Sequence, residues 1–229
     1  MRVDRTSWLA ERRSAVEEDY TRDAPSYDAG YDPATPVHRR FVTSLIDQTR
    51  AGGTILDAAC GTAPYAGMIL ERGLVYVGID QSHGMLAQAR AKWPEFRFEL
   101  AGLQELALHE EFDGLMCTDA MENVPPEHWP TVVAGFHRAL RVDSHAYVTV
   151  EEIDHDEIEQ AFADGVGRGW PLVLGEVIEG DTAGYHFYPS RAQVEAWLHI
   201  EGFEIVEEAD EALDGYGYHH LLLRASGPS

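Results

Sequence analysis

Short apolar runs and longer amphipathic segments alternate through the middle of the chain. The apolar runs are rich in Val, Ile, Leu and Phe, and they cover residues 54–59, 75–80, 96–100, 112–117 and 145–150. Between them, helical spacing of apolar positions fills residues 64–73, 82–93 and 126–140. Strands that recur with intervening helices predict a parallel sheet whose two faces are covered by helices.

The C-terminal part of the chain departs from this alternation. A helix predicted over residues 190–202 is followed by two apolar segments, residues 203–209 and 217–225. Only a short segment, "DEALDGYG", joins these two, which predicts a hairpin-like connection and an antiparallel last strand. The whole pattern predicts an α/β fold: a Rossmann-like, doubly wound sheet of about seven strands, mostly parallel, with helices on both faces.

Two segments lie outside this regular core. Residues 7–20 are spaced as an amphipathic helix, and residues 21–35 are rich in Pro, Gly, Asp and Tyr, which is typical of a loop. A helix over residues 36–50 begins at Pro36. Residues 151–189 are mostly polar, with one predicted helix over 156–166. We therefore expect an N-terminal segment with a helix at 1–35, and a core at 36–229 with a variable insertion at about 153–189.

The charge of the chain narrows the classes of partner. Among 229 residues there are 17 basic and 40 acidic side chains, a formal net charge of -23. Such a surface repels phosphate backbones, and the pair Arg39-Arg40 is too small a basic patch to offset it, so no nucleic-acid partner is expected. The N-terminal segment has no apolar core typical of a signal peptide, and no run reaches the length of a membrane span. We expect a cytoplasmic protein without a membrane partner.

Cysteine and histidine positions indicate neither a disulfide framework nor a metal site. Cys60 and Cys117 both lie in apolar strand-end contexts and are expected to be buried thiols. The acids are many, but no spaced set of His, Cys and Asp accompanies them. His219 and His220 alternate along the last strand, so at most one of them is expected to be buried and neither is expected to be a ligand.

Small or polar residues follow the predicted strands at the points where they end. In an open parallel sheet, ligands gather beyond these carboxyl ends. Asp57 lies near the end of the first strand, before a loop of small residues around Gly61. Asp80 lies at the end of the second strand, 23 residues after Asp57. A carboxylate at this second position can accept both hydroxyl protons of a ribose, although it could also cap the helix that follows.

These segments together resemble the ordered motifs of class I S-adenosylmethionine-dependent methyltransferases. The resemblance rests on "ILDAACGTA", "VYVGIDQSHGMLAQAR", "FELAGLQEL", "FDGLMCTDAMENV" and "HAYVTVEE", and it runs from about residue 37 to the C-terminus. It implies a methyltransferase that uses S-adenosyl-L-methionine and releases S-adenosyl-L-homocysteine. Additions such as the N-terminal segment and the insertion form a lid over the substrate in small-molecule members of the family.

The resemblance also implies the residues that hold the cofactor. An acid and a small-residue loop would hold its methionine end, and an acid after the second strand would bind its ribose. Gln81 and Met85 would flank its adenine, with Met85 supplying the apolar contact. Arg39 or Arg40 would reach its carboxylate. The full set is Asp57, Ala59, Gly61, Asp80, Gln81, Met85, Leu103, Gln104, Thr118, Asp119 and Arg39.

The loop after the first strand departs from the family pattern. Glycine is common in the family where this chain has Ala59 and Ala63. We expect both alanines to have negative φ, which alanine accepts, so that Gly61 alone needs the freedom of glycine. The family also often has an acid at the position of Gly102, so adenine recognition here is expected to rest on backbone and apolar contacts.

The acceptor site has to come from the variable segments, because this reaction has no fixed catalytic triad. Candidate catalytic residues are His186, Tyr27 and Glu152, of which His186 could be a base. Acids and aromatics crowd the strand ends, which favours a small amine or aromatic acceptor and slightly prefers a nitrogen over an oxygen. Two alternatives stay open: a non-catalytic cofactor-binding module that acts through interactions, and a nicotinamide-dependent oxidoreductase on a related fold.

Overall fold

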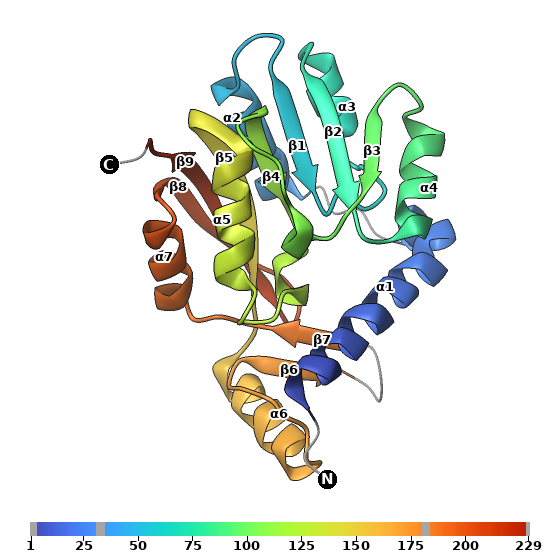
Figure 1. The fold of residues 1–229 in the computed structure, drawn as a ribbon, viewed down its shortest axis with the longest axis vertical. Helices are drawn as coiled ribbons and strands as arrows, with labels where there is room; N and C mark the ends of the chain where they lie inside the picture. Colours follow the sequence, from blue (N-terminus) through green and yellow to red (C-terminus); the bar gives the residue numbers. More distant parts are fainter. Residues whose placement is uncertain (1–3, 31–34, 180–183, 228–229) are drawn as a thin grey trace.

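The main sheet has seven strands, as the sequence predicts (Figure 1). The computed structural model describes residues 4–30, 35–179 and 184–227. The order across the sheet is β3-β2-β1-β4-β5-β9-β8. The bounds of these strands are β1 Thr54–Ala58, β2 Val75–Asp80, β3 Arg97–Leu100, β4 Phe112–Cys117, β5 Leu140–Glu152, β8 Phe203–Ala212 and β9 Gly217–Ala225.

Strand direction confirms the expected mixed sheet. β1 pairs in parallel with both β2 and β4, and β4 pairs in parallel with β5. The last strand, β9, is antiparallel to β5 on one side and to β8 on the other. The antiparallel strand is therefore an interior strand rather than an edge. Because β1, β2, β4 and β5 run the same way, their carboxyl ends meet at one edge of the sheet.

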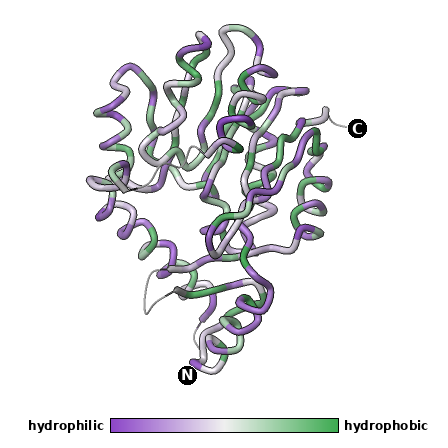
Figure 2. Tube along the Cα trace, turned by 180° about the vertical axis from the view of Figure 1, so that it is seen from behind, coloured by the Kyte–Doolittle hydropathy of each residue, from purple (hydrophilic) through white to green (hydrophobic). Residues whose placement is uncertain are grey.

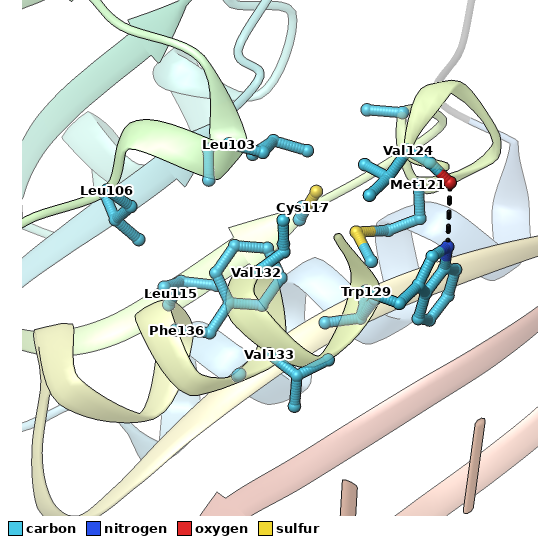
Figure 3. Packing of buried hydrophobic residues seen from close by; sticks show 14 of the residues in the cluster. Leu103, Leu106, Leu115, Cys117, Met121, Val124, Trp129, Val132, Val133 and Phe136 are labelled. Atoms are coloured by element: carbon cyan, nitrogen blue, oxygen red, sulfur yellow. Dashed lines mark hydrogen bonds between the residues drawn. The ribbon is translucent and has the colours of Figure 1, made fainter. Parts of the chain in front are cut away.

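Strand alternation divides the buried side chains between the two faces. Ile55 packs with α2, α3 and α4, whereas Leu56 packs on the face covered by α5 and α7. Figure 3 shows the second of these layers, where the indole of Trp129 donates to the Val124 carbonyl at 3.1 Å. The helices are α2 Pro36–Gln48, α3 Ala66–Glu71, α4 His83–Lys92, α5 Trp129–Ala139 and α7 Arg191–Ile200.

The first helix, α1 (Arg5–Gly30), is longer than the sequence predicts. It continues through part of the segment expected to be a loop, and residues 31–34 lie outside the described residues. Pro25 lies inside the helix and has no N–H to bond the Thr21 carbonyl. That carbonyl faces α4 instead, where a Cβ on Gly84 would lie 2.5 Å from it. Glycine at this position therefore lets α1 approach α4 closely.

The insertion is more regular than its composition suggests. It contains α6 (His155–Gly167), close to the predicted helix, and a two-stranded antiparallel sheet of β6 (Glu176–Glu179) and β7 (Gly184–Phe187). The short strands were not predicted. Hydrophilic and hydrophobic positions mix along α6, which extends away from the main sheet (Figure 2). Its one buried residue is Gly165. Among the described residues, no helix combines the length and apolar character needed to cross a membrane.

Candidate functional site

A cleft of about 910 Å³, open to solvent, lies at the carboxyl ends of the parallel strands. Ten of the eleven residues predicted to hold a cofactor line it. These are Asp57, Ala59 and Gly61 after β1, Asp80, Gln81 and Met85 around β2 and α4, Leu103 and Gln104 in the short helix η1 (Leu103–Glu105), and Thr118 and Asp119 after β4. The strand topology therefore brings together residues that are up to 62 positions apart (119 − 57).

The eleventh residue, Arg39, lies elsewhere, which corrects its predicted place at the cleft. It is exposed on α2 and is outside the cleft lining. Successive residues of a helix point about 100° apart, and Arg39 lies on the solvent side of the face that α2 buries. The helix buries His38, whose Nε2 lies 3.0 Å from Asp119 Oδ1.

The loop after β1 has three left-handed residues, and not one as expected. Ala59, Gly61 and Ala63 have φ of 64°, 52° and 59°. The prediction that both alanines have negative φ is wrong. A left-handed alanine costs about 1–2 kcal/mol, and the loop's hydrogen bonds offset this cost: Cys60 N–H donates to Ile79 O, and Ala63 N–H to Cys60 O, both at 2.8 Å.

Asp80 fixes the same loop through backbone hydrogen bonds. Its Oδ2 accepts from Gly61 N–H at 2.9 Å, and its Oδ1 accepts from Ser82 N–H at 2.7 Å. The helix cap that was an alternative role for Asp80 is supplied by Ser82, whose hydroxyl accepts from Met85 N–H. Burial raises the pKa of Asp80, although these backbone N–H groups act against the rise. Each carboxylate oxygen retains a lone pair for a ligand hydroxyl.

Asp57 is a buried acid beside Asp80. Its Oδ2 accepts a hydrogen bond from the Tyr76 hydroxyl at 2.6 Å. Burial raises the pKa of Asp57 to about 7, with a further contribution from the charge of Asp80, while the Tyr76 hydrogen bond opposes the rise. A cationic group placed here would stabilise the ionised carboxylate and lower its pKa.

The helix α1 covers the cleft and is tied to its rim. Tyr20 and Tyr27 on α1 line the cleft. The Thr21 hydroxyl lies 2.8 Å from that of Ser82, and Arg13 Nε donates to Gln81 Oε1 at 3.3 Å. These contacts hold α1 across the open side of the strand ends (Figure 1).

A second cavity of about 520 Å³ adjoins the first. Tyr20, Tyr27 and Asn123 line both cavities and so form the junction between them. The second cavity is completed by Val16, Asp19, Asp23, Gly184 and His186. It therefore lies between α1 and the insertion.

The three predicted catalytic residues separate in the structure. Tyr27 stands at the junction, and burial raises its pKa to about 12, followed by the effect of Asp119. His186 lines the second cavity, with its Nδ1 3.0 Å from the Tyr188 hydroxyl. Glu152 lines neither cavity, because both of its oxygens accept hydrogen bonds from Arg191 at 2.7 Å.

Glu122 contacts Asn123, one of the residues at the junction of the two cavities. It is buried in the short helix η2 (Met121–Asn123), and its Oε1 accepts from Asn123 Nδ2 at 2.9 Å. Its Oε2 has no hydrogen-bond partner within the described part of the chain. Burial raises the pKa of Glu122 well above its ordinary value, and the charge of Glu151 adds to this, so both favour the neutral carboxyl.

A buried polar cluster lies behind Asp119 and was not predicted from the sequence. It brings together His38 of α2, Glu211 of β8 and His220 of β9. The expectation that at most one of His219 and His220 is buried is wrong, because β9 is an interior strand with both faces covered. Burial lowers the pKa of His220 to about 4, and the neighbouring His38 adds to this.

The sequence matches known methyltransferases over its central part. A sequence model of the methyltransferase domain matches residues 55–143. A malonyl-[acyl-carrier protein] O-methyltransferase from Serratia marcescens is 30% identical over 96 residues, which is 42% of this chain. An uncharacterized methyltransferase from Synechocystis is 26% identical over 91 residues. The matched part spans 37% of the first relative's length and 43% of the second's.

Solved structures extend the similarity to nearly the whole fold. A SAM-dependent methyltransferase from Methanosarcina mazei has a TM-score of 0.71 at 14% identity, covering 85% of this chain and 99% of its own. The 1,6-didemethyltoxoflavin-N1-methyltransferase from Burkholderia thailandensis, solved with 1,6-didemethyltoxoflavin and S-adenosylhomocysteine, has a TM-score of 0.70 at 18% identity, covering 98% and 92%. The chain is therefore similar in sequence to methyltransferases over residues 55–143, and it shares the fold of S-adenosylmethionine-dependent methyltransferases.

Proposed function

We propose that the chain transfers the methyl group of S-adenosylmethionine to a small molecule bound in the second cavity. The observation that carries this proposal is the pair of joined cavities. One lies at the strand ends where this fold binds its cofactor, and the other opens from it at Tyr20, Tyr27 and Asn123. Two substrates can thus meet at one junction.

The residues of the cleft at the strand ends fit the parts of S-adenosylmethionine. The carboxylate of Asp80 would accept from the ribose hydroxyls. Met85 and Leu103 are apolar and buried, which suits the adenine. Asp57 is a buried acid whose raised pKa indicates that no cation neutralises it in the protein alone, and the ammonium of the cofactor would supply one.

The chain's own contribution to the reaction is mainly alignment. The sulfonium of the bound cofactor supplies an already activated methyl group. Tyr20, Tyr27 and Asn123 would set the direction in which an acceptor approaches, and α1 would keep water out. Because its pKa is about 12, Tyr27 remains protonated at neutral pH and would donate a hydrogen bond rather than act as a base. His186 remains the candidate base in this cavity.

The second cavity favours a nitrogen acceptor. Its lining includes the rings of Tyr20 and Tyr27 and the carboxyl groups of Asp19 and Asp23. Arg22 pairs with both carboxyl groups, so one positive charge faces two negative ones. Acids and aromatic faces suit an amine or a cationic heterocycle. The relatives include both an O-methyltransferase and a nitrogen methyltransferase, so an oxygen acceptor remains the second candidate.

The cofactor site is tested by titrating S-adenosylhomocysteine into the protein by calorimetry. Replacing Asp80→Asn should weaken binding by at least about 10-fold, because a hydrogen bond to a charged group contributes about 1.5–3 kcal/mol. The matched control is Asp113→Asn. Asp113 is also a strand acid that accepts from a backbone N–H, that of Thr54, but it lies near the start of β4, at the edge of the sheet opposite the cleft. Equal losses in both variants would contradict the ribose role of Asp80.

The acceptor class is tested with a methyl-labelled cofactor and a panel of small amines and phenols. We expect transfer to at least one amine, and a lower kcat for His186→Gln than for His155→Gln, an exposed histidine of α6. Product from no acceptor would favour a non-catalytic binding module. Binding of NADH without binding of S-adenosylhomocysteine would favour an oxidoreductase instead.

A further inference from the structure

The buried cluster of His38, Glu211 and His220 has the composition of a metal site. Two imidazoles and one carboxylate are a common ligand set for divalent transition metals. Each of the three side chains offers one ligand atom, and these atoms lie within 4.8 Å of one another. The residues come from α2, β8 and β9, so an ion bound here would join the N-terminal part of the core to its C-terminal hairpin.

The separations between these atoms match a coordination sphere. Glu211 Oε2 lies 3.4 Å from His38 Nδ1 and 3.3 Å from His220 Nε2. In a tetrahedral site with metal–ligand bonds near 2.1 Å, neighbouring ligand atoms are about 3.4 Å apart. Both distances are longer than a normal hydrogen bond, and they correspond to two edges of such a tetrahedron.

The outer nitrogens of both imidazoles are held as they are in metal sites. A ligating histidine generally directs its other ring nitrogen to a carboxylate or another oxygen, which fixes its tautomer. His38 Nε2 lies 3.0 Å from Asp119 Oδ1, and His220 Nδ1 lies 2.8 Å from the Tyr147 hydroxyl. An ion bound here would require protons on these two outer nitrogens, so that the lone pairs of His38 Nδ1 and His220 Nε2 are available to it.

One of the inner atoms, His220 Nε2, lacks a hydrogen-bond partner among the described residues. His220 is fully buried, and its Nε2 has no hydrogen-bond partner within residues 4–30, 35–179 and 184–227. The partners of the Glu211 carboxylate in those same ranges are Thr35, His38 and His220, none of which carries a fixed positive charge. A lone pair on the buried His220 Nε2 that faces the Glu211 carboxylate is unfavourable unless a cation lies between them.

Thr35 lies on the remaining side of the cluster. Its hydroxyl is 2.8 Å from His38 Nδ1 and donates to Glu211 Oε2 at 2.9 Å. An ion that takes the Nδ1 lone pair would replace the first contact and leave the second in place. The side chain of Glu211 retains 12% exposure, which gives an ion a route to the cluster.

We propose that His38, Glu211 and His220 bind one divalent transition-metal ion of the Zn²⁺ type. Through His38, the ion orients Asp119, which lines the cofactor cleft and is also held by the Thr149 hydroxyl. The site is distinct from the methyl-transfer residues, and its failure would leave the proposed methyl transfer untouched.

The test uses the full chain without an affinity tag, treated with a chelator and then titrated with Zn²⁺. We expect one ion per chain, and replacement by Co²⁺ should give the intense visible absorption of a tetrahedral ion. His220→Gln and Glu211→Gln should each weaken Zn²⁺ binding by at least about 100-fold. The matched control is His219→Gln on the same strand, whose imidazole contacts Glu208 instead at 2.9 Å and should leave the affinity unchanged.

Folding of each variant is checked by far-UV circular dichroism before titration. The wild-type Co²⁺ spectrum needs no variant, so the proposal remains testable even if one substitution prevents folding. Absence of stoichiometric binding by the wild type would overturn the proposal. So would an octahedral Co²⁺ spectrum in the wild type, or the same affinity in His220→Gln as in His219→Gln.

Discussion

The clearest energetic prediction concerns Asp57, whose burial should make the folded protein less stable as the pH rises. The pKa of this group is raised from 3.8 to about 7. Between these two values the unfolded state has lost its proton and the folded state has kept it. Stability therefore falls as pH rises through this window and levels off above pH 7. At 1.36 kcal/mol per pKa unit, the full loss is about 4 kcal/mol.

Replacing Asp57→Asn removes the titration and keeps an oxygen that can accept from the Tyr76 hydroxyl. The variant should exceed the wild type in free energy of unfolding by about 1.5 kcal/mol at pH 5 and by about 4 kcal/mol at pH 8. Urea unfolding of both proteins between pH 5 and 8, without ligand, measures this difference. We expect it to grow by about 2.5 kcal/mol across that range.

The control variant, Asp113→Asn, should show a pH dependence of stability with the opposite sign. Asp113 is bonded to Arg50 and to the Thr54 N–H, and although burial acts in the other direction, these partners lower its pKa. A lowered pKa contributes stability above the unfolded value that is lost as pH falls, so Asp113→Asn should be destabilising at pH 8 and less so at low pH. A difference between wild type and Asp57→Asn that stays constant from pH 5 to 8 would refute the account of Asp57.

Three further predictions follow from the same site. S-adenosylhomocysteine should bind the wild type roughly tenfold more tightly at pH 7.5 than at pH 5.5, because its ammonium favours ionised Asp57, and calorimetry should show little such change in Asp57→Asn. Gly84→Ala should lower the melting temperature and loosen α1, because its Cβ would lie 2.5 Å from the Thr21 carbonyl. The control Gly167→Ala should be neutral or stabilising, because no atom lies within 4 Å of its Cβ. Gly61→Ala should lower the free energy of unfolding by about 1 kcal/mol, because residue 61 has a positive φ. It should weaken cofactor binding by a larger free energy, because its Cβ would point into the open space of the cleft.

The sequence predicted the sheet and most of the cleft because both depend on local patterns. Each apolar run ends on its own polar residues, and the fold class then requires those ends to meet. The extension of α1 was missed because Pro25 and Gly30 are typical of a loop, whereas contacts of Asp28 with Lys92 of α4 and with Thr62 of the β1 loop depend on the tertiary fold. The strands β6 and β7 have four residues each, too few for a periodic pattern.

Other features depend on distant parts of the chain. The angles of Ala59 and Ala63 are set by hydrogen bonds across the loop and to β2, which override the intrinsic preference of alanine. His38 and His220 are 182 positions apart (220 − 38), so no spacing rule could bring them together. Their meeting depends on β9 lying inside the sheet under α2.

The most direct test of the proposed reaction is a crystal structure of the protein with S-adenosylhomocysteine. The account predicts that the ribose lies against Asp80 and that the sulfur lies at the junction formed by Tyr20, Tyr27 and Asn123, facing the second cavity. A sulfur that faces away from that junction, or a ligand bound outside the cleft, would contradict it.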